Sequence, residues 1–351
     1  MMKLVISRTG FLYFLWFFVQ ASSYAQSGQS LSNQSLSNQS LSNQSLSNQS
    51  LGSQYSGLVS FGDSLSDTGN LASVTTNFPF PFFDNRISNG PVLVDYLAAE
   101  LGFQAVASRH TQTDLGGNNF SVSGGNIVGS DVEDLGSQVS AYLTRQGGRA
   151  DASNLFFLMI GGNDLRDIRG TLSASDATAK ITMVAQTLEG ELTRLYDAGA
   201  RDFLISNVAD VGSIPETLAR QSTDPNISQR ARDYVQAYNN QLDGVLQRLQ
   251  SRPGALASKY DLFAELDRIL NNASSLGFSQ TEVGCFTLEQ FSFHPDCVFG
   301  TRFDRFVFFD SLHPSAATNR IASSGLLASI PERDVPMSSV FMAAITLLLL
   351  D

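Results

Sequence analysis

A single serine stands where an enzyme can use it as a nucleophile. The apolar run Leu58–Phe61 leads directly into Gly62-Asp63-Ser64, and residues able to start a helix follow. This pattern predicts that Ser64 lies at the carboxyl end of a strand, where open α/β sheets keep their active sites. A serine hydroxyl is a weak nucleophile at neutral pH, so the hypothesis also requires a general base, a carboxylate that orients the base, and donors for an oxyanion.

The candidate base is His313, in the segment Asp310-Ser311-Leu312-His313-Pro314 that follows the aromatic run Phe306–Phe309. An Asp three residues before a His lies close enough in a turn to accept the imidazole N–H and fix the tautomer of the ring. Taken alone, Asp-x-x-His is also typical of a cap at the start of a helix.

Two glycine-rich turns offer oxyanion donors. In Asn119–Asn126, the adjacent Gly124 and Gly125 let backbone N–H groups approach a reacting carbonyl. Gly161-Gly162-Asn163-Asp164 again follows an apolar run and offers the side-chain amide of Asn163. Each turn alone is typical of an ordinary loop. The order of all these clusters, two of them directly after apolar runs, indicates a serine hydrolase.

The elements that must position these residues alternate between strands and helices. Apolar runs predict strands over Leu58–Phe61, Leu155–Ile160, Phe203–Ser206 and Tyr260–Phe263. Apolar residues at helical spacing predict helices over Pro91–Leu101, Ala177–Ala198 and Ser228–Gln250. Short buried strands alternating with helices predict an α/β fold whose parallel sheet is covered on both faces.

Together the blocks resemble those of the GDSL (SGNH) hydrolase family of esterases and lipases, over about Leu58 to Ser324. Gly62–Asn70 is similar to the family's nucleophile motif, and Asn85–Leu97 to the RFSNGPVWVDYL segment of its larger lipase-like, plant-like branch. Three further blocks match in order: Asn119–Gly125 (the family's NFAxGG), Gly161–Asp164 and Asp310–Pro314.

The resemblance implies a flavodoxin-like three-layer α/β/α sandwich with a parallel central sheet, distinct from hydrolases with a Gly-x-Ser-x-Gly elbow. It makes Ser64 the nucleophile, His313 the general base and Asp310 the residue that orients the base. The implied oxyanion donors are the backbone N–H groups of Ser64 and Gly124 and the side-chain amide of Asn163. Ser123 stands where the family usually has its first glycine, which leaves open whether Gly124 or Gly125 is the donor.

The function implied is that of an exported serine esterase or lipase, which hydrolyses lipid or short-chain acyl esters through an acyl-enzyme. One alternative is an acyltransferase, in which an alcohol takes the acyl group in place of water. Another is a surface or binding protein that retains the fold without turnover, although the complete set of Ser64, Asn163, Asp310 and His313 argues against it. The stretch Phe78–Phe83 either receives an acyl chain or a lipid surface at the rim of the site, or packs as a loop.

The remaining candidate groups favour structural roles. Asp63 would point away from the reacting side of a strand-end turn, which indicates a hydrogen-bonding role. His110 lies in a polar loop, and His294 lies in a loop with no strand before it. No His, Cys and Asp residues have metal-ligand spacing, so we expect neither a metal nor a cofactor. The formal charge of −11 and the lack of basic runs argue against nucleic acid as a partner.

The amino-terminal residues resemble a targeting segment. Residues 1–25 combine Lys3 and Arg8, an apolar core from Gly10 to Val19 and a small-residue cleavage site at Ser23-Tyr24-Ala25, which predicts a signal peptide and a secreted or cell-envelope location. An uncleaved amino-terminal anchor is the alternative. Residues 26–54 hold a Leu-Ser-Asn-Gln-Ser repeat with too few apolar groups to fold, which predicts a flexible linker.

The hydrolase domain is predicted over residues 55–330, followed by an apolar tail over 331–351. The tail has the outline of a degenerate sorting signal, and a packed or frayed carboxyl end is the alternative. Cys285 and Cys297 are the only cysteines, and in an exported protein they are expected to form a disulfide. In a cytosolic protein they would be two free thiols.

Overall fold

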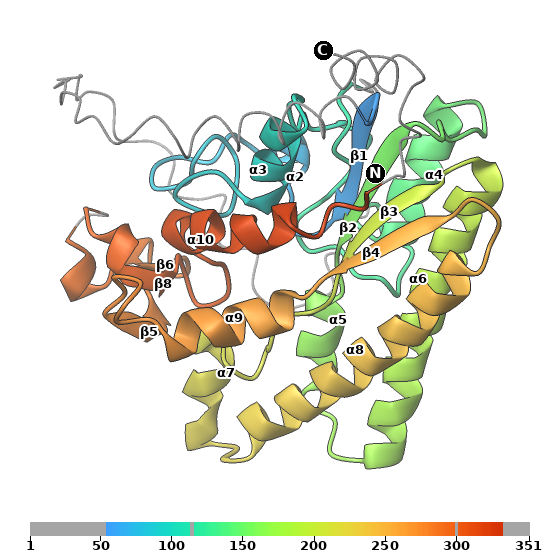
Figure 1. The fold of residues 1–351 in the computed structure, drawn as a ribbon. Helices are drawn as coiled ribbons and strands as arrows, with labels where there is room; N and C mark the ends of the chain where they lie inside the picture. The colour runs from blue at the N-terminus through green and yellow to red at the C-terminus, as the bar shows by residue number, and fades with distance from the viewer. Residues whose placement is uncertain (1–53, 113–115, 299–300, 333–351) are drawn as a thin grey trace, which may run out of the picture.

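The computed structural model describes residues 54–112, 116–298 and 301–332 (Figure 1). The predicted signal peptide, the repeat and nearly all of the predicted carboxyl-terminal tail lie outside these residues. The two ends of the described part meet, because the Tyr55 hydroxyl donates a hydrogen bond to the carbonyl of Pro331 at 2.7 Å. Within the described part, no helix is both long and apolar enough to cross a membrane.

A four-stranded parallel sheet forms the centre of the fold. Its strands lie in the order β1 (Gly57–Gly62), β2 (Asn154–Met159), β3 (Asp202–Ser206) and β4 (Leu256–Tyr260). The segment after Asn118 extends the sheet beyond β1, since Phe120 N–H donates to the Ser60 carbonyl at 2.8 Å. With this segment counted, the chain order across the sheet is 2-1-3-4-5, the flavodoxin-like order. The predicted fold class is therefore confirmed.

Helices cover both faces of the sheet (Figure 1). On one face α4, α6 and α8 pack side by side, and on the other α3 and α9 pack against α10. The helices are α2 (Asn70–Val74), α3 (Leu93–Glu100), α4 (Leu135–Arg145), α5 (Gly162–Ile168), α6 (Ala174–Ala198), α7 (Pro215–Ala219), α8 (Ile227–Gln250), α9 (Leu262–Asn271) and α10 (Ala316–Leu327).

The predicted elements agree with this arrangement except at the fourth strand. The three predicted helices correspond to α3, α6 and α8. The strand predicted over Tyr260–Phe263 is wrong: β4 ends at Tyr260, and α9 begins at Leu262. At the edge of the sheet β4 carries the half-buried Ser258 and Lys259 and so has no apolar run. Asp261 then accepts the N–H of Ala264 and caps α9.

A second, smaller core lies beside the sheet and consists mainly of aromatic side chains. It contains the parallel pair β5 (Gln280–Gly284) and β8 (Phe306–Phe308) and the hairpin β6 (Phe286–Thr287) and β7 (Ser292–Phe293). The predicted Cys285–Cys297 disulfide is present, with 5.4 Å between the Cα atoms. We call the buried side chains around it the aromatic cluster: Phe82, Ile87, Phe286, Phe303, Phe306 and Phe309.

The aromatic cluster packs directly against the segment that carries Asp310. Cys285 N–H donates to the Phe308 carbonyl at 3.2 Å, and Phe286 N–H donates to the Phe309 carbonyl at 2.8 Å. A Cβ at Gly284 would lie 2.4 Å from the Asp310 carbonyl, so only glycine fits there. The disulfide therefore closes a segment that supports the candidate base.

Replacing both Cys285 and Cys297 with alanine is expected to lower the free energy of unfolding by about 3 kcal/mol, because the unfolded chain is no longer constrained by that loop. Urea denaturation of the oxidised protein and of the double variant measures the difference. The reduced wild type serves as the control and should match the variant. Equal stability in the oxidised and reduced wild type would contradict the prediction.

Candidate active site

Two sequence blocks meet at one edge of the sheet because β1 and β2 are parallel and in register. Gly62 pairs with Met159, so Ser64 and the Gly161–Asp164 turn leave the sheet together. Asp63 is buried, and its carboxylate accepts the N–H of Leu65 at 3.0 Å. Burial raises the pKa of Asp63 to about 7, although this N–H and the nearby His313 favour its charged form. Its contacts agree with the predicted hydrogen-bonding role.

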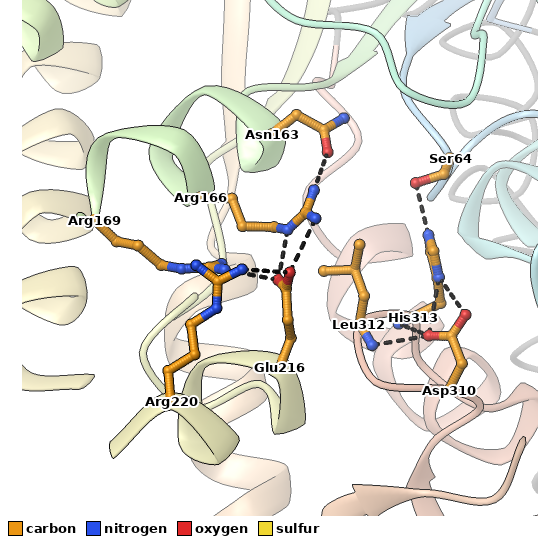
Figure 2. Close-up of polar contacts among 9 residues, drawn as sticks. All are labelled: Ser64, Asn163, Arg166, Arg169, Glu216, Arg220, Asp310, Leu312 and His313. Carbon is orange, nitrogen blue, oxygen red and sulfur yellow. Dashed lines mark hydrogen bonds and ion pairs between the residues drawn. The ribbon is translucent and has the colours of Figure 1, made fainter. Parts of the chain in front are cut away.

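Ser64, His313 and Asp310 form a continuous chain of hydrogen bonds (Figure 2). The Oγ atom of Ser64 lies 2.8 Å from Nε2 of His313. On the other side of the ring, Nδ1 lies 2.8 Å from Oδ2 of Asp310 and 3.0 Å from its Oδ1. All three side chains are nearly buried, at 7%, 7% and 3% exposure for Ser64, His313 and Asp310. The structure thus brings these three residues together, although Ser64 and His313 are 249 positions apart in the sequence.

The Asp310–His313 turn keeps the carboxylate ionised. Burial alone would raise the pKa of Asp310, but the His313 ring and the N–H groups of His313 and Leu312 hold it below its ordinary value. Those two N–H groups donate to Oδ1 at 2.7 and 2.8 Å. An ionised carboxylate accepts the Nδ1 proton and leaves Nε2 free to accept the proton of the Ser64 hydroxyl.

The backbone N–H groups of the turns around the site differ in whether they already have an acceptor. Gly125 N–H is occupied, because it donates to the Val122 carbonyl at 3.0 Å. Within the part of the chain that the structure describes, the N–H groups of Ser64 and Gly124 have no hydrogen-bond acceptor. Gly124 has φ 93°, a conformation that favours glycine. Of the two glycines left open by the sequence, Gly124 therefore has the available donor.

The amide of Asn163 lies at the start of α5. Its Nδ2 donates to the Gly125 carbonyl at 2.9 Å, and its Oδ1 accepts from Arg166 at 3.2 Å. An amide NH₂ group carries two N–H bonds, so one remains for another acceptor. Asn163 therefore joins the two glycine turns and retains one donor.

A buried polar network, missed by the sequence analysis, joins the Ser64 loop to the Asn119 turn. The Asp67 carboxylate accepts the N–H groups of Gly69, Asn70 and Leu71. It also accepts both the N–H and the hydroxyl of Ser123, each at 2.9 Å. Ser123, the position at which the chain departs from the family pattern, thus holds the loop in place. The sequence did contain a signal for this network, because Asp67 lies within the nucleophile motif Gly62–Asn70.

An apolar cavity of about 100 Å³ opens beside Ser64 and Asn163. It extends to α9 and α10, where Leu266, Ile269 and Ala322 line it. The other apolar side chains of its wall are Leu65, Leu93, Met159, Ile160, Val208, Ala209, Val211, Ile214, Leu262, Phe308, Leu312 and Pro314. Such a wall suits a hydrocarbon group in contact with the reacting carbonyl.

The Phe78–Phe83 stretch does not line this cavity. Its Phe78 and Phe82 rings lie 5.4 Å apart and pack into the aromatic cluster. Phe80 and Phe83 are exposed, at 67% and 44%. The packing of Phe78 and Phe82 agrees with the loop alternative drawn from the sequence, and contact of the exposed Phe80 and Phe83 with a lipid surface stays a prediction.

The other two histidines lie in structural settings. His294 accepts the N–H of Asp296 through Nδ1 and packs against Phe306 in the aromatic cluster. His110 is half-buried, and its ring packs against Phe120. Over residues 54–112, 116–298 and 301–332, no three His, Cys, Asp or Glu side chains are grouped so that they could hold a metal ion.

Comparison with known proteins agrees with this geometry. A family model described as GDSL-like lipase/acylhydrolase matches residues 58–326. Two GDSL esterase/lipases of Arabidopsis thaliana are 28% identical over 273 residues (65% of this chain, 73% of the relative) and 26% identical over 312 residues (77% and 81%). A phosphatidylcholine-sterol acyltransferase of Aeromonas hydrophila is 27% identical over 237 residues (66% of each chain).

The family model spans most of the chain, and its matched range includes the serine, amide, carboxylate and imidazole that meet at the carboxyl edge of the sheet. The chain therefore belongs to the GDSL-like lipase/acylhydrolase family and is a carboxylic ester hydrolase.

Proposed function

We propose that the chain hydrolyses esters of apolar acyl groups through an acyl-enzyme on Ser64. The observation that carries this proposal is the 2.8 Å contact between Ser64 Oγ and Nε2 of His313, whose ring is held by Asp310 on its other side. A base within hydrogen-bond reach of the hydroxyl, itself oriented by a third group, is the requirement for an activated serine.

The reaction follows from these contacts. Ser64 Oγ attacks the ester carbonyl carbon while its proton passes to Nε2 of His313. As the carbon–oxygen bond of the ester breaks, the same proton passes to the leaving alcohol. Water then loses a proton to Nε2 of His313 and attacks the acyl carbon. As the bond between that carbon and Ser64 Oγ breaks, the proton passes from His313 to Oγ, which releases the carboxylic acid and restores the Ser64 hydroxyl. Asp310 stays ionised throughout and stabilises the imidazolium.

Three donors would stabilise the negative charge that develops on the carbonyl oxygen. They are the free N–H groups of Ser64 and Gly124 and the remaining N–H of the Asn163 amide. Donors fixed before the reaction are effective because they need no reorganisation as charge develops, and losing one typically costs about 10²–10³ in rate.

Ser64→Ala is expected to remove esterase activity and labelling by a fluorophosphonate, because no other group would attack the carbonyl. His313→Ala and Asp310→Ala should each lower kcat by roughly three orders of magnitude or more, with the smaller loss for Asp310 since the base remains. Hydrolysis of nitrophenyl esters and gel detection of the label measure both effects. His294→Ala is the control and should retain activity; an essential His294 with a dispensable His313 would refute the assignment.

The acyl group is proposed to be apolar because the cavity beside Ser64 is. An acetyl group would leave most of the apolar cavity wall uncovered. A longer acyl chain would cover that wall, and each CH₂ group that it buries would stabilise the complex by roughly 0.8 kcal/mol. Simple short-to-medium-chain esters and lipid esters both supply such a group. The exposed Phe80 and Phe83 are compatible with contact at a lipid surface.

Ala322→Leu is expected to shift the substrate preference toward shorter acyl groups, because Ala322 lines the cavity from α10. The value of kcat/KM should fall about ten-fold or more for nitrophenyl octanoate and change little for the acetate, a loss on the scale of one or two methylenes. Ala328→Leu is the matched control, exposed at the end of the same helix. Equal losses for both esters would argue that the cavity does not receive the acyl chain.

A second candidate function is acyl transfer. It is favoured by the similarity to the acyltransferase of Aeromonas hydrophila. The same acyl-enzyme would then pass its acyl group to an alcohol instead of water. Product analysis with a long-chain alcohol in the assay distinguishes the two, since transfer yields a new ester and hydrolysis yields only the acid.

Export is also part of the proposal. The targeting pattern of residues 1–25 and the Cys285–Cys297 disulfide both support a secreted or cell-envelope location, because disulfides persist in oxidising compartments. Expression of the full chain, followed by amino-terminal sequencing of the mature protein, identifies the cleavage site after Ala25 if the proposal holds.

A further inference from the structure

The amide of Asn163 can take only one orientation in this site. Its Nδ2 faces the carbonyl of Gly125, which can only accept, and its Oδ1 faces the guanidinium of Arg166, which can only donate. A flipped amide would place oxygen against oxygen and N–H against N–H. Figure 2 shows the amide nitrogen pointing away from Arg166.

Arg166 is itself held by Glu216. Nε of Arg166 lies 2.6 Å from Oε2 of Glu216, and Nη2 lies 3.1 Å from Oε1, a bidentate pairing that fixes the plane of the guanidinium. Arg169, which is almost fully buried, and Arg220 also contact Glu216, at 2.9 and 3.3 Å. The Glu216 carboxylate thus remains paired even without Arg166.

Glu216 also makes a hydrogen bond to the turn that carries Asp310 and His313. Its backbone N–H, in the first turn of α7, donates to the carbonyl of Ser311 at 2.9 Å. Ser311 lies between Asp310 and His313. One residue therefore fixes the cation behind the Asn163 amide and contacts the turn that carries the base.

We propose that Arg166 and Glu216 are positioning residues of the reaction: Glu216 fixes Arg166, and Arg166 fixes and polarises the Asn163 amide so that its free N–H faces the oxyanion. This inference rests on the proposed function. Arg166 does not touch the reacting atoms and acts through Asn163. A cation hydrogen-bonded to the amide oxygen draws electron density from the amide and strengthens its N–H as a donor.

The test is a double-mutant cycle between Arg166 and Asn163, measured as kcat and KM on a nitrophenyl ester. Arg166→Met keeps the length of the side chain and removes its donors. It is expected to lower kcat on the order of ten-fold, less than the ~10²-fold loss expected for Asn163→Ala, with KM nearly unchanged in both. Because Arg166 acts through Asn163, the double variant should be no slower than Asn163→Ala alone, within about two-fold.

Two further variants separate positioning from stability. Arg220→Ala is the matched control, since Arg220 also contacts Glu216 but not Asn163, and it should leave kcat unchanged. Glu216→Gln should lower kcat in the wild-type background and have no further effect beside Arg166→Met. Thermal melting of each preparation shows whether a loss of kcat is accompanied by a loss of folding.

Different experimental results would overturn this inference and the proposed function. An active Ser64→Ala variant would overturn the proposed function, whatever Arg166 does. If Ser64→Ala is inactive but the losses of Arg166→Met and Asn163→Ala multiply in the double variant, the positioning role of Arg166 is wrong. A rise in KM with unchanged kcat in Arg166→Met would also overturn it, because that signature belongs to substrate binding.

Discussion

The in-register parallel pairing of β1 with β2 is the constraint on which the site depends. The two strands end together at Gly62 and Met159, so the turns after them are forced into contact. Both turns favour glycine, Gly62 because a side chain would clash with backbone and Gly161 because of its positive φ. A Cβ at Gly62 would lie 2.6 Å from the Met159 carbonyl, and Gly161, at φ 115°, would bring one within 3.0 Å of Ile127. Glycines at these positions let the backbones approach and place Ser64 beside Asn163.

The second requirement is that buried polar groups near Ser64 are generally paired; among the described residues, the hydroxyls of Ser66 and Ser121 are exceptions. Asn119 illustrates the rule, since its Nδ2 donates to the Ser66 carbonyl and the Thr68 hydroxyl, while its Oδ1 accepts from Ser60 and Ser121. Leaving a buried donor unpaired costs roughly 1–3 kcal/mol. Against that background, the N–H of the buried Ser64 has no acceptor among the described residues, and in the proposed mechanism a substrate oxygen would pair with it. Gly124 is exposed, so water can pair with its N–H before a substrate binds.

The sequence could predict features that depend on neighbours along the chain. An apolar run followed by a glycine turn predicted where β1 and β2 end, and the spacing of Asp310 and His313 predicted a turn in which the carboxylate reaches the ring. β4 was misplaced because an edge strand with Ser258 and Lys259 half exposed lacks the apolar run of a central strand. Glu216 and Arg166 were missed because they are 50 residues apart and meet only in the folded protein, while Pro215-Glu216 on its own is an ordinary start of a helix.

The charge of Arg166 explains why it needs the bidentate ion pair with Glu216. The guanidinium lies close enough to the buried Asp310 for their charges to interact, and an unrestrained cation there would be drawn toward the carboxylate that must orient His313. Burial would raise the pKa of Glu216, but its bonds to Arg166 and Arg169 lower it to about 2. Glu216 therefore stays ionised near neutral pH, where it can hold Arg166 in place through the bidentate pairing and keep the guanidinium directed at the Asn163 amide.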